Sequence, residues 1–270
     1  MTVAPVPTPQ DLKQAEAISR SAMATMLSHH TVRSFKDQPL PDGLLERLVQ
    51  AGTRASTSSN MQAYGIIHIA EPQLKSQVAE LCADQQQIHQ SAAFLAICAD
   101  LHKLVLCCRD HGADEGSAGT EEALLVSVID AALVMQNIAV AAESLGLGIC
   151  MIGAMRNHPA AVREALRLPP NVVALSGLCI GYPNDDATPK PRLPLEATFF
   201  RNHYPGDSEL RETLSTYDEI QSAWYRERDM HPKDPRWTSV MARRLPGTRK
   251  REELARVLRE QGFLNPTKPE

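Results

Sequence analysis

Residues 121–156 read EEALLVSVIDAALVMQNIAVAAESLGLGICMIGAMR. Between residues 123 and 142 almost every side chain is apolar, and Ala, Leu and Met favour helices, so this run predicts one long helix. Gly146 provides its C-terminal stop. The apolar positions cover more than one helical face. The helix is therefore expected to be buried, either at the centre of a large domain or between two subunits.

A membrane span is the rival interpretation of this run, and its polar residues disfavour it. Asp130, Gln136 and Asn137 stand in mid-segment, and the longest unbroken apolar run is only residues 131–135. A bilayer-crossing helix needs about 20 predominantly apolar residues and tolerates such polar groups poorly. The run is expected to belong to the core of a soluble protein.

A short apolar strand is predicted at residues 149–154, directly after the helix. It ends on Gly153 and Ala154, and small residues at a strand end let backbone N–H groups approach a flat ligand. The Gly146-Leu147-Gly148 triplet is not a dinucleotide fingerprint. That motif needs a strand before it and a helix after it, whereas the order here is reversed.

Length and composition describe an ordinary cytoplasmic protein. The chain has 270 residues, 43% apolar content and a net charge of −4, enough for one large α/β domain or two small ones. Aromatic residues make up 4%, which disfavours a base-stacking nucleic-acid surface. Six cysteines without a CxxC pair are typical of a reducing compartment. Residues 1–10 are rich in proline and do not resemble a signal peptide.

The remaining pattern predicts few strands among many helices, which favours an α+β fold with helices on both sides of one central sheet. Residues 1–10 are expected to form a flexible arm, 11–205 the core, and 206–270 a helical extension of the same domain. The extension is basic, since residues 226–270 hold twelve Lys or Arg against seven Asp or Glu. Strands are expected at 64–70, 94–99 and 172–180, helices at 11–27, 41–55, 73–82, 159–166, 209–228 and 249–261, and loops at 84–87, 112–119 and 181–194.

Four polar segments interrupt the apolar pattern and together provide cations, hydroxyls and amides. They are His29–Arg33, Ser56–Gln62, Asp84–Gln87 and Lys190–Arg192. A phosphorylated heteroaromatic ligand needs such groups, with charge for its phosphate and donors for its ring edge. Each segment alone is more simply explained as a loop or a solvated turn.

Further short motifs accompany these segments in a fixed order. They are HHTVR-x-F at 29–35 with Pro39, the serine-rich run ending at Gln62, FLAICAD at 94–100, DAALVMQN at 130–137, AAESLGLG at 141–148, Ile152-Gly153, Arg156-Asn157, Gly181-Tyr182-Pro183 and KPRLP at 190–194. In combination they resemble the oxygen-insensitive, NADPH-dependent nitroreductases, in the branch that includes bacterial flavin reductase P. The resemblance runs from about Met26 to the C-terminus, and KPRLP is its most specific part.

The resemblance implies a homodimer with two FMN sites at the subunit interface and the long helix in the shared core. It assigns the FMN phosphate and ribityl end to His29, His30, Thr31, Lys190 and Arg192, and the pyrimidine edge of the ring to Arg33. It assigns hydrogen bonds to the ring or the ribityl chain to Thr57, Ser58 and Gln85, and places Met151, Ile152, Gly153 and Ala154 along the ring. The family usually has Arg where this chain has His30, and often Ser at Thr31; neutral His is a poorer phosphate partner.

The chemistry implied by the resemblance comes from the cofactor. NADPH passes a hydride to flavin N5 and leaves, and a nitroaromatic, a quinone or free flavin then takes two electrons in a ping-pong cycle. Arg33 is the expected catalytic residue, because a cation stabilises the anionic reduced flavin. Among cations for the 2′-phosphate of NADPH, Arg228 matches best by position, and Lys233 and Arg251 are weaker candidates.

Alternatives remain open at this stage. The fold could serve a specialised oxidase or dehydrogenase of a single metabolite, or a flavin-binding sensor without activity. A metal site from Cys98, His102, Cys107, Cys108 and His111 is disfavoured, because the spacings match no known zinc motif and Cys98 lies in a strand pattern. A nucleic-acid role for the basic C-terminal region is disfavoured by the acidic chain as a whole.

Overall fold

The computed structural model describes residues 22–185, 188–247 and 251–265. They form two compact units, one from the residues up to 187 together with those from 251 onward, and one from residues 188–250. This division differs from the expected boundary at 205/206. The segment that begins at Thr188 belongs with α9 (Asp207–Arg226), because the Tyr217 hydroxyl donates to the Pro191 carbonyl at 2.8 Å.

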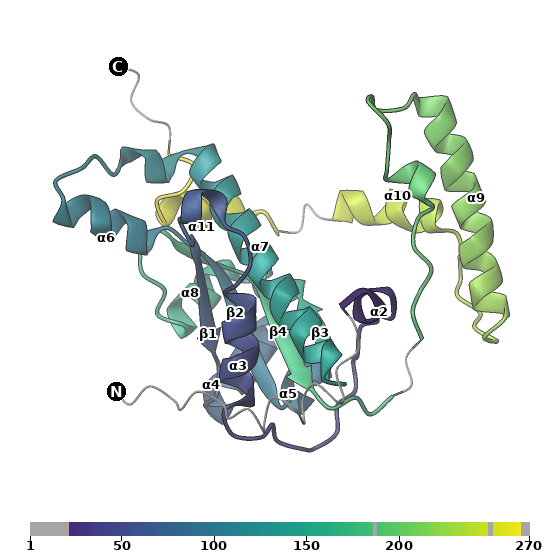
Figure 1. The fold of residues 1–270 in the computed structure, drawn as a ribbon, viewed down its shortest axis with the longest axis horizontal. Coiled ribbons are helices and arrows are strands. Elements are labelled where there is room, and N and C mark those ends of the chain that lie inside the picture. The colour runs from purple at the N-terminus through teal and green to yellow at the C-terminus, as the bar shows by residue number, and fades with distance from the viewer. Residues whose placement is uncertain (1–21, 186–187, 248–250, 266–270) are drawn as a thin grey trace. The chain divides into compact units, whose positions relative to one another are not determined.

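The first unit is built on a four-stranded sheet (Figure 1). Its strands are β1 (Tyr64–His68), β2 (Ala93–Asp100), β3 (Gly148–Ile152) and β4 (Val172–Gly181). Their spatial order is β1-β2-β4-β3, and every neighbouring pair is antiparallel. The predicted α+β fold with one central sheet is confirmed, and the sheet is antiparallel throughout.

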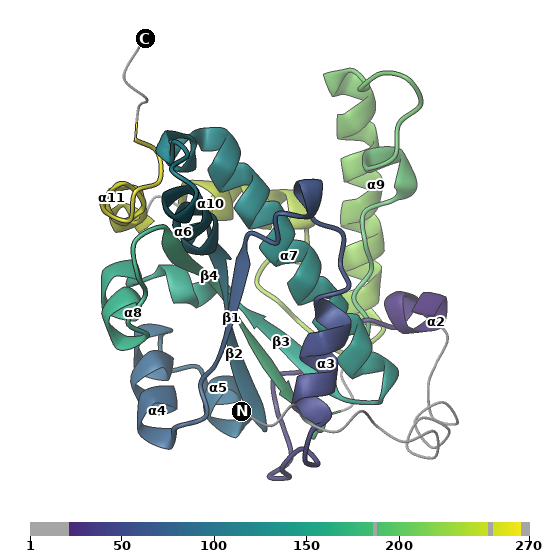
Figure 2. The same ribbon diagram turned by 60° about the vertical axis from the view of Figure 1, so that its left-hand side comes forward.

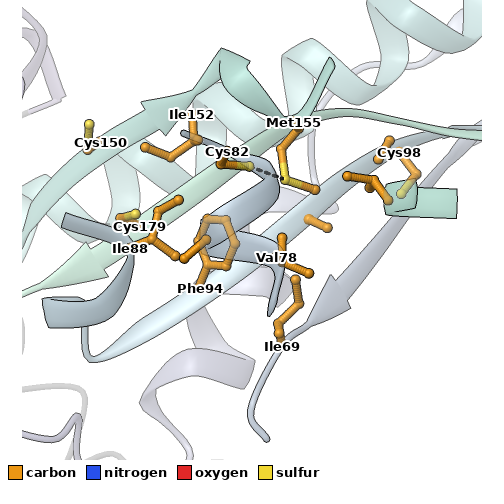
Figure 3. Packing of buried hydrophobic residues seen from close by; sticks show 14 of the residues in the cluster. Ile69, Val78, Cys82, Ile88, Phe94, Cys98, Cys150, Ile152, Met155 and Cys179 are labelled. Atoms are coloured by element: carbon orange, nitrogen blue, oxygen red, sulfur yellow. Dashed lines mark hydrogen bonds between the residues drawn. The ribbon is translucent and has the colours of Figure 1, made fainter. Parts of the chain in front are cut away.

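Helices cover both faces of this sheet (Figure 2). α3 (Leu44–Gly52) and α7 (Glu121–Ser144) lie on one face, and α4 (Pro72–Leu81), α5 (Gln86–Gln90) and α8 (Pro159–Ala165) lie on the other. The central strand β2 alternates between them, with Leu95 and Ile97 facing α7 and Phe94 and Cys98 facing α4. Figure 3 shows the buried cluster on the α4 face, which includes Phe94 and Cys98. In this cluster the Cys82 sulfur lies 3.5 Å from the Met155 sulfur.

The long helix α7 has defined ends. The Thr120 side chain accepts a 3.2 Å hydrogen bond from the Ala123 N–H and caps its N-terminus. At the other end Gly146 takes a φ of +77°, and the Leu147 N–H bonds to the Ala142 carbonyl at 3.1 Å.

Within a single chain α7 is buried on one side only. Asp130 and Val134 point into the core, whereas Leu125, Ile129 and Leu133 are 56%, 55% and 43% exposed. Among the described helices α7 alone is long and apolar enough to cross a membrane, by length and composition. It nevertheless packs on the sheet and on α3. The expected burial on most sides is therefore not achieved by one chain.

The other described helices are divided between the two units. They are α2 (Ala22–Leu27), η1 (Ser58–Asn60), α6 (His102–Asp110), η2 (Gly116–Gly119), η3 (Gly153–Arg156), η4 (Leu195–Ala197), α10 (Trp237–Gly247) and α11 (Glu253–Glu260). The expected helix at 11–27 is described only from Ala22. No helix was predicted at α6 or α10. The predicted strand 149–154 is wrong at its end, because the chain turns into η3 at Gly153.

Candidate active site

The segment around Arg33 lies against the edge strand of the sheet. The Val32 N–H donates to the Ile149 carbonyl at 3.0 Å, and Phe35 forms a bridge with Pro183. This approach requires a glycine at position 148, because a Cβ there would stand 2.6 Å from Cγ2 of Val32. The predicted ligand-binding segment is thereby fixed beside β3.

The two histidines of this segment have separate partners. His29 Nδ1 lies 2.7 Å from Glu143 Oε1, and His30 Nδ1 lies 3.1 Å from the Ser28 carbonyl. His29, His30 and Thr31 are half-buried. His30 and Glu143 both line a cavity of about 140 Å³. Two imidazoles and a carboxylate therefore meet at the C-terminal end of α7.

Arg33 is exposed and lies close enough to Cys150 to act on it. Burial raises the pKa of the Cys150 thiol, while the Arg33 guanidinium and a hydrogen bond with Gln87 act to lower it. The Gln87 amide donates to Gln85 Oε1 at 2.7 Å, and Gln85 donates to the Cys82 carbonyl at 2.9 Å. Arg33 and Gln85 are therefore brought to one side of β3.

The end of β3 provides the small residues that the sequence predicted. Met151 is 36% exposed and Ile152 is buried, as the alternation of a strand requires. Gly153 and Ala154 are half-buried in η3. Arg33 lies beside β3 at Cys150, whereas the cation next to Gly153 is Arg156, whose Nη2 would stand 3.4 Å from a Cβ at that glycine.

The loop with Thr57 and Ser58 is held by Asp130 of α7, whose carboxylate accepts hydrogen bonds from the backbone N–H groups of Ser58 and Ala63, both at 3.0 Å. The loop is strained, because Ser59, Asn60 and Gln62 have φ values of 48°, 57° and 50°. Non-glycine residues in this region are often found at binding sites.

This loop is distant from the histidines within one chain. It is attached at Asp130, whereas His29 is attached at Glu143, and thirteen residues of α7 separate these anchors by about 20 Å at the rise of an α-helix. Within the first unit, His29–Arg33 lie between the C-terminal end of α7 and β3, and Gln85 is joined to them through Gln87 and Cys150. Met151–Ala154 follow at the end of β3, and Thr57 and Ser58 are held at the middle of α7.

Four of the predicted cations lie in the second unit. Arg228 stacks on the Trp224 ring at 4.5 Å, and the Lys190 ammonium lies 5.9 Å from the same ring. Arg192 and Lys233 are exposed. Trp224, which the sequence did not single out, thus organises Lys190 and Arg228.

The remaining predicted cation, Arg251, belongs to the first unit and lies beside η3. Its Nε donates to Asn157 Oδ1 at 3.3 Å. Burial and the Arg251 charge lower the pKa of Arg156, whose guanidinium donates to the Leu175 carbonyl. Among the described residues neither arginine forms an ion pair with a carboxylate. The pair leaves positive charge that suits an anion.

Sequence reasoning missed the residues that hold the site rather than line it. Asp130 is buried and Glu143 is half-buried, and both belong to an apolar helix. An acid within an apolar helix is unusual, and this was the signal that could have identified them. Gln87 and Arg156 lie in segments that the sequence singled out, Asp84–Gln87 and Arg156-Asn157, but neither was given a role. Within the part of the chain that the structure describes, no three His, Cys, Asp or Glu side chains are placed to hold a metal ion.

Comparisons with known proteins agree with this architecture. The model of the nitroreductase family matches residues 26–182, and that of the nitroreductase family C-terminal domain matches residues 190–265. A Bacillus subtilis protein named FMN reductase (NADPH) is 36% identical over 245 residues, which cover 90% of this chain and 98% of the relative. A Staphylococcus epidermidis NADPH-dependent oxidoreductase is 37% identical over 249 residues, covering 88% and 96%.

Solved structures extend the likeness to three dimensions. The NfrA1 nitroreductase from B. subtilis superposes with a TM-score of 0.86 at 36% identity, over 90% of this chain and 99% of that one. The matched regions include both described units. The chain belongs to the nitroreductase family.

Proposed function

We propose that this protein is an FMN-dependent oxidoreductase that uses NADPH to reduce a small-molecule acceptor, namely a nitroaromatic, a quinone or free flavin. The observation that carries this proposal is the placement of the exposed Arg33 guanidinium beside β3 and the small residues that follow it. The names of the two relatives, an NADPH-linked FMN reductase and an NADPH-dependent oxidoreductase, support the choice of cofactor and reductant.

The donor set at this end of the sheet fits FMN. The half-buried His29, His30 and Thr31 suit a phosphate and a ribityl chain, and Gln85 is an amide within the same group. Gly153 and Ala154 are small enough to let a flat ring approach the backbone, where the Arg156 guanidinium lies beside Gly153. By the family resemblance Lys190 and Arg192 are further phosphate partners.

When bound, FMN would supply the chemistry, accepting a hydride from NADPH and passing two electrons on. The chain's part is positioning and charge. Arg33 would stand at the pyrimidine edge, where its fixed positive charge stabilises negative charge on the ring. No nucleophile or strong base is needed, so the buried thiols around Cys150 take no part.

We propose that the enzyme is a homodimer. The exposed Leu125, Ile129 and Leu133 recur every four residues and form one apolar stripe on α7. A second copy packed antiparallel on this stripe would cover it through a two-fold interface. It would also bring Thr57 and Ser58 of one copy towards the His29 end of the other, which a single chain does not do. Each of the two FMN sites would then need both copies.

Preference for NADPH requires cations for the 2′-phosphate. Arg228 is our first choice, with Lys233 and Arg251 as further candidates, and Arg251 has the support of its neighbour Arg156. The usage of cysteine, with six free thiols, supports a cytoplasmic location.

Reconstitution tests the proposal and separates it from its alternatives. The purified chain is incubated with excess FMN, desalted, and assayed for bound flavin per chain, then for turnover with NADPH and a panel of unrelated quinones and nitroarenes. One FMN per chain and broad turnover support the proposal. Turnover of a single metabolite points to a specialised enzyme, and bound flavin without turnover points to a sensor. Failure to bind FMN overturns the proposal.

A further inference from the structure

We propose that Glu143 is a positioning residue that orients His29 for the phosphate of FMN, so that this side chain makes the site prefer the phosphorylated cofactor over riboflavin. The inference rests on the proposed function, and it adds a residue that contacts no ligand itself. It starts from a short contact between two side chains that are 114 residues apart.

The contact fixes the protonation of one imidazole nitrogen. His29 Nδ1 lies 2.7 Å from Glu143 Oε1, and the two side chains are only 28% and 12% exposed. An ionised carboxylate only accepts hydrogen bonds. Nδ1 must therefore carry a proton and donate a hydrogen bond to Glu143. The remaining ring nitrogen, Nε2, is then the one available to a ligand. Glu143 thereby sets both the orientation of the ring and the nitrogen that faces outward.

Glu143 occupies a position that is unfavourable for a purely structural acid. It stands in the last turn of α7, where the partial negative charge of the helix dipole opposes a carboxylate, and no basic residue lies in that turn. Its second oxygen, Oε2, is buried, and among the described residues no donor lies within hydrogen-bonding distance of it. Leaving a buried acceptor unpaired is destabilising. Among the polar contacts of the described residues, the bond from His29 is what compensates this charge.

A phosphate at the outer ring nitrogen would complete this arrangement. With both ring nitrogens protonated in that complex, the ring would donate through Nδ1 to Glu143 and through Nε2 to a phosphate oxygen, between two anions. The effect is specific to the phosphate, because riboflavin lacks that group and meets only the ring and ribityl contacts. The neighbouring His30 bonds to the Ser28 carbonyl instead and has no carboxylate partner among the described residues. His29 is thus the histidine prepared for phosphate.

The test compares the dissociation constants of FMN and riboflavin in the flavin-free full-length protein, measured by quenching of flavin fluorescence. Glu143→Gln keeps an acceptor for Nδ1 but removes the charge. We expect it to weaken FMN binding about tenfold, since charge-assisted hydrogen bonds are roughly twice as strong as neutral ones, and to change riboflavin binding less than twofold. The control Glu122→Gln, an exposed acid in the first turn of the same helix, should leave both constants unchanged.

A double-mutant cycle with His29→Asn separates positioning from a general structural role. Once the imidazole is absent, Glu143→Gln should cost no further FMN affinity. Equal losses for FMN and riboflavin, or additive losses in the cycle, would overturn the inference. If Glu143→Gln does not fold, the His29→Asn variant alone tests the inference. Unchanged FMN affinity in His29→Asn would also overturn the inference. A wild-type protein that binds neither flavin contradicts the proposed function itself.

Discussion

The carboxylate of Asp130 accepts a 3.0 Å hydrogen bond from the backbone N–H of Ser58, 72 residues earlier in the chain. Its other oxygen accepts from the Ala63 N–H at the same distance. A buried acid in the middle of an apolar helix is explained by this pair of bonds, which clamp both ends of the strained loop 58–63.

Replacing Asp130 by Asn should therefore destabilise the protein. The amide keeps one acceptor oxygen but turns an N–H donor towards a backbone N–H, so one of the two bonds is lost and a buried donor is left unpaired. We expect a loss of about 2–3 kcal/mol in the free energy of unfolding, measured by circular dichroism in urea. Asp110→Asn, an exposed acid at the end of α6, serves as the control. Equal stabilities for the two variants would contradict the clamp.

Arg33→Ala should weaken FMN retention and slow reduction of the bound flavin by NADPH, because it removes the only described cation that acts on β3 from the 29–35 segment. Stopped-flow absorbance gives the reduction rate, and we expect a fall of about ten- to a hundredfold. Arg54→Ala removes an exposed arginine elsewhere and should behave as wild type. Unchanged retention and rate in Arg33→Ala would refute its assigned role.

Arg228→Ala should raise the KM for NADPH far more than that for NADH, since only NADPH carries the 2′-phosphate. Losing a charge-assisted contact corresponds to a factor of about ten or more. Steady-state kinetics with both reductants measure the ratio. Arg211→Ala is the matched control, because Arg211 is an exposed arginine of α9, the helix that ends just before Arg228. The same effect on both reductants would remove Arg228 from the phosphate site.

Ile129→Glu should convert a dimer into monomers, because it places a charge at the centre of the apolar stripe on α7. Light scattering after gel filtration measures the molecular mass. Leu106→Glu alters an apolar residue of α6 that is 43% exposed and should not change the mass. A wild-type monomer, or an Ile129→Glu dimer, would show that the stripe is not the interface. FMN retention should fall together with dimerisation, as the shared site requires.

The thiols should divide into two classes. Burial raises the pKa of Cys82 and of Cys98 to about 12, and it raises that of Cys150 and of Cys179, so at pH 8 these four remain neutral and protected. Cys107 is exposed and Cys108 half-exposed. Ellman's reagent at pH 8 should react quickly with about two thiols in the native protein and with all six in denaturant. Rapid reaction of more than two would contradict the burial of the cluster.

Local patterns predicted most of the fold. The 24-residue helix α7 and the four strands are mainly apolar runs with clear stops, so their positions were predicted within a few residues. α10 was missed because its apolar pattern is weak and Pro246 interrupts it. The end of β3 was missed because nothing in Gly153-Ala154 distinguishes a strand end from the turn of η3.

The sequence suggested which residues form the candidate site but not which contacts hold them in place. Polar segments amid apolar sequence made His29–Arg33 and Ser56–Gln62 candidates. The bonds from His29 to Glu143 and from Ser58 to Asp130 join residues 114 and 72 positions apart, and only the packing of α7 sets these pairs. His29 and Ser58 contact different parts of α7, at Glu143 and at Asp130, and this separation likewise depends on tertiary structure.

The most direct test of the proposed activity is an anaerobic visible spectrum of the FMN-loaded protein before and after one equivalent of NADPH. We predict a yellow protein whose visible flavin absorbance bleaches on mixing and returns when a quinone is added. NADH at the same concentration should bleach it more slowly. A loaded protein that stays yellow with NADPH would contradict the proposed activity.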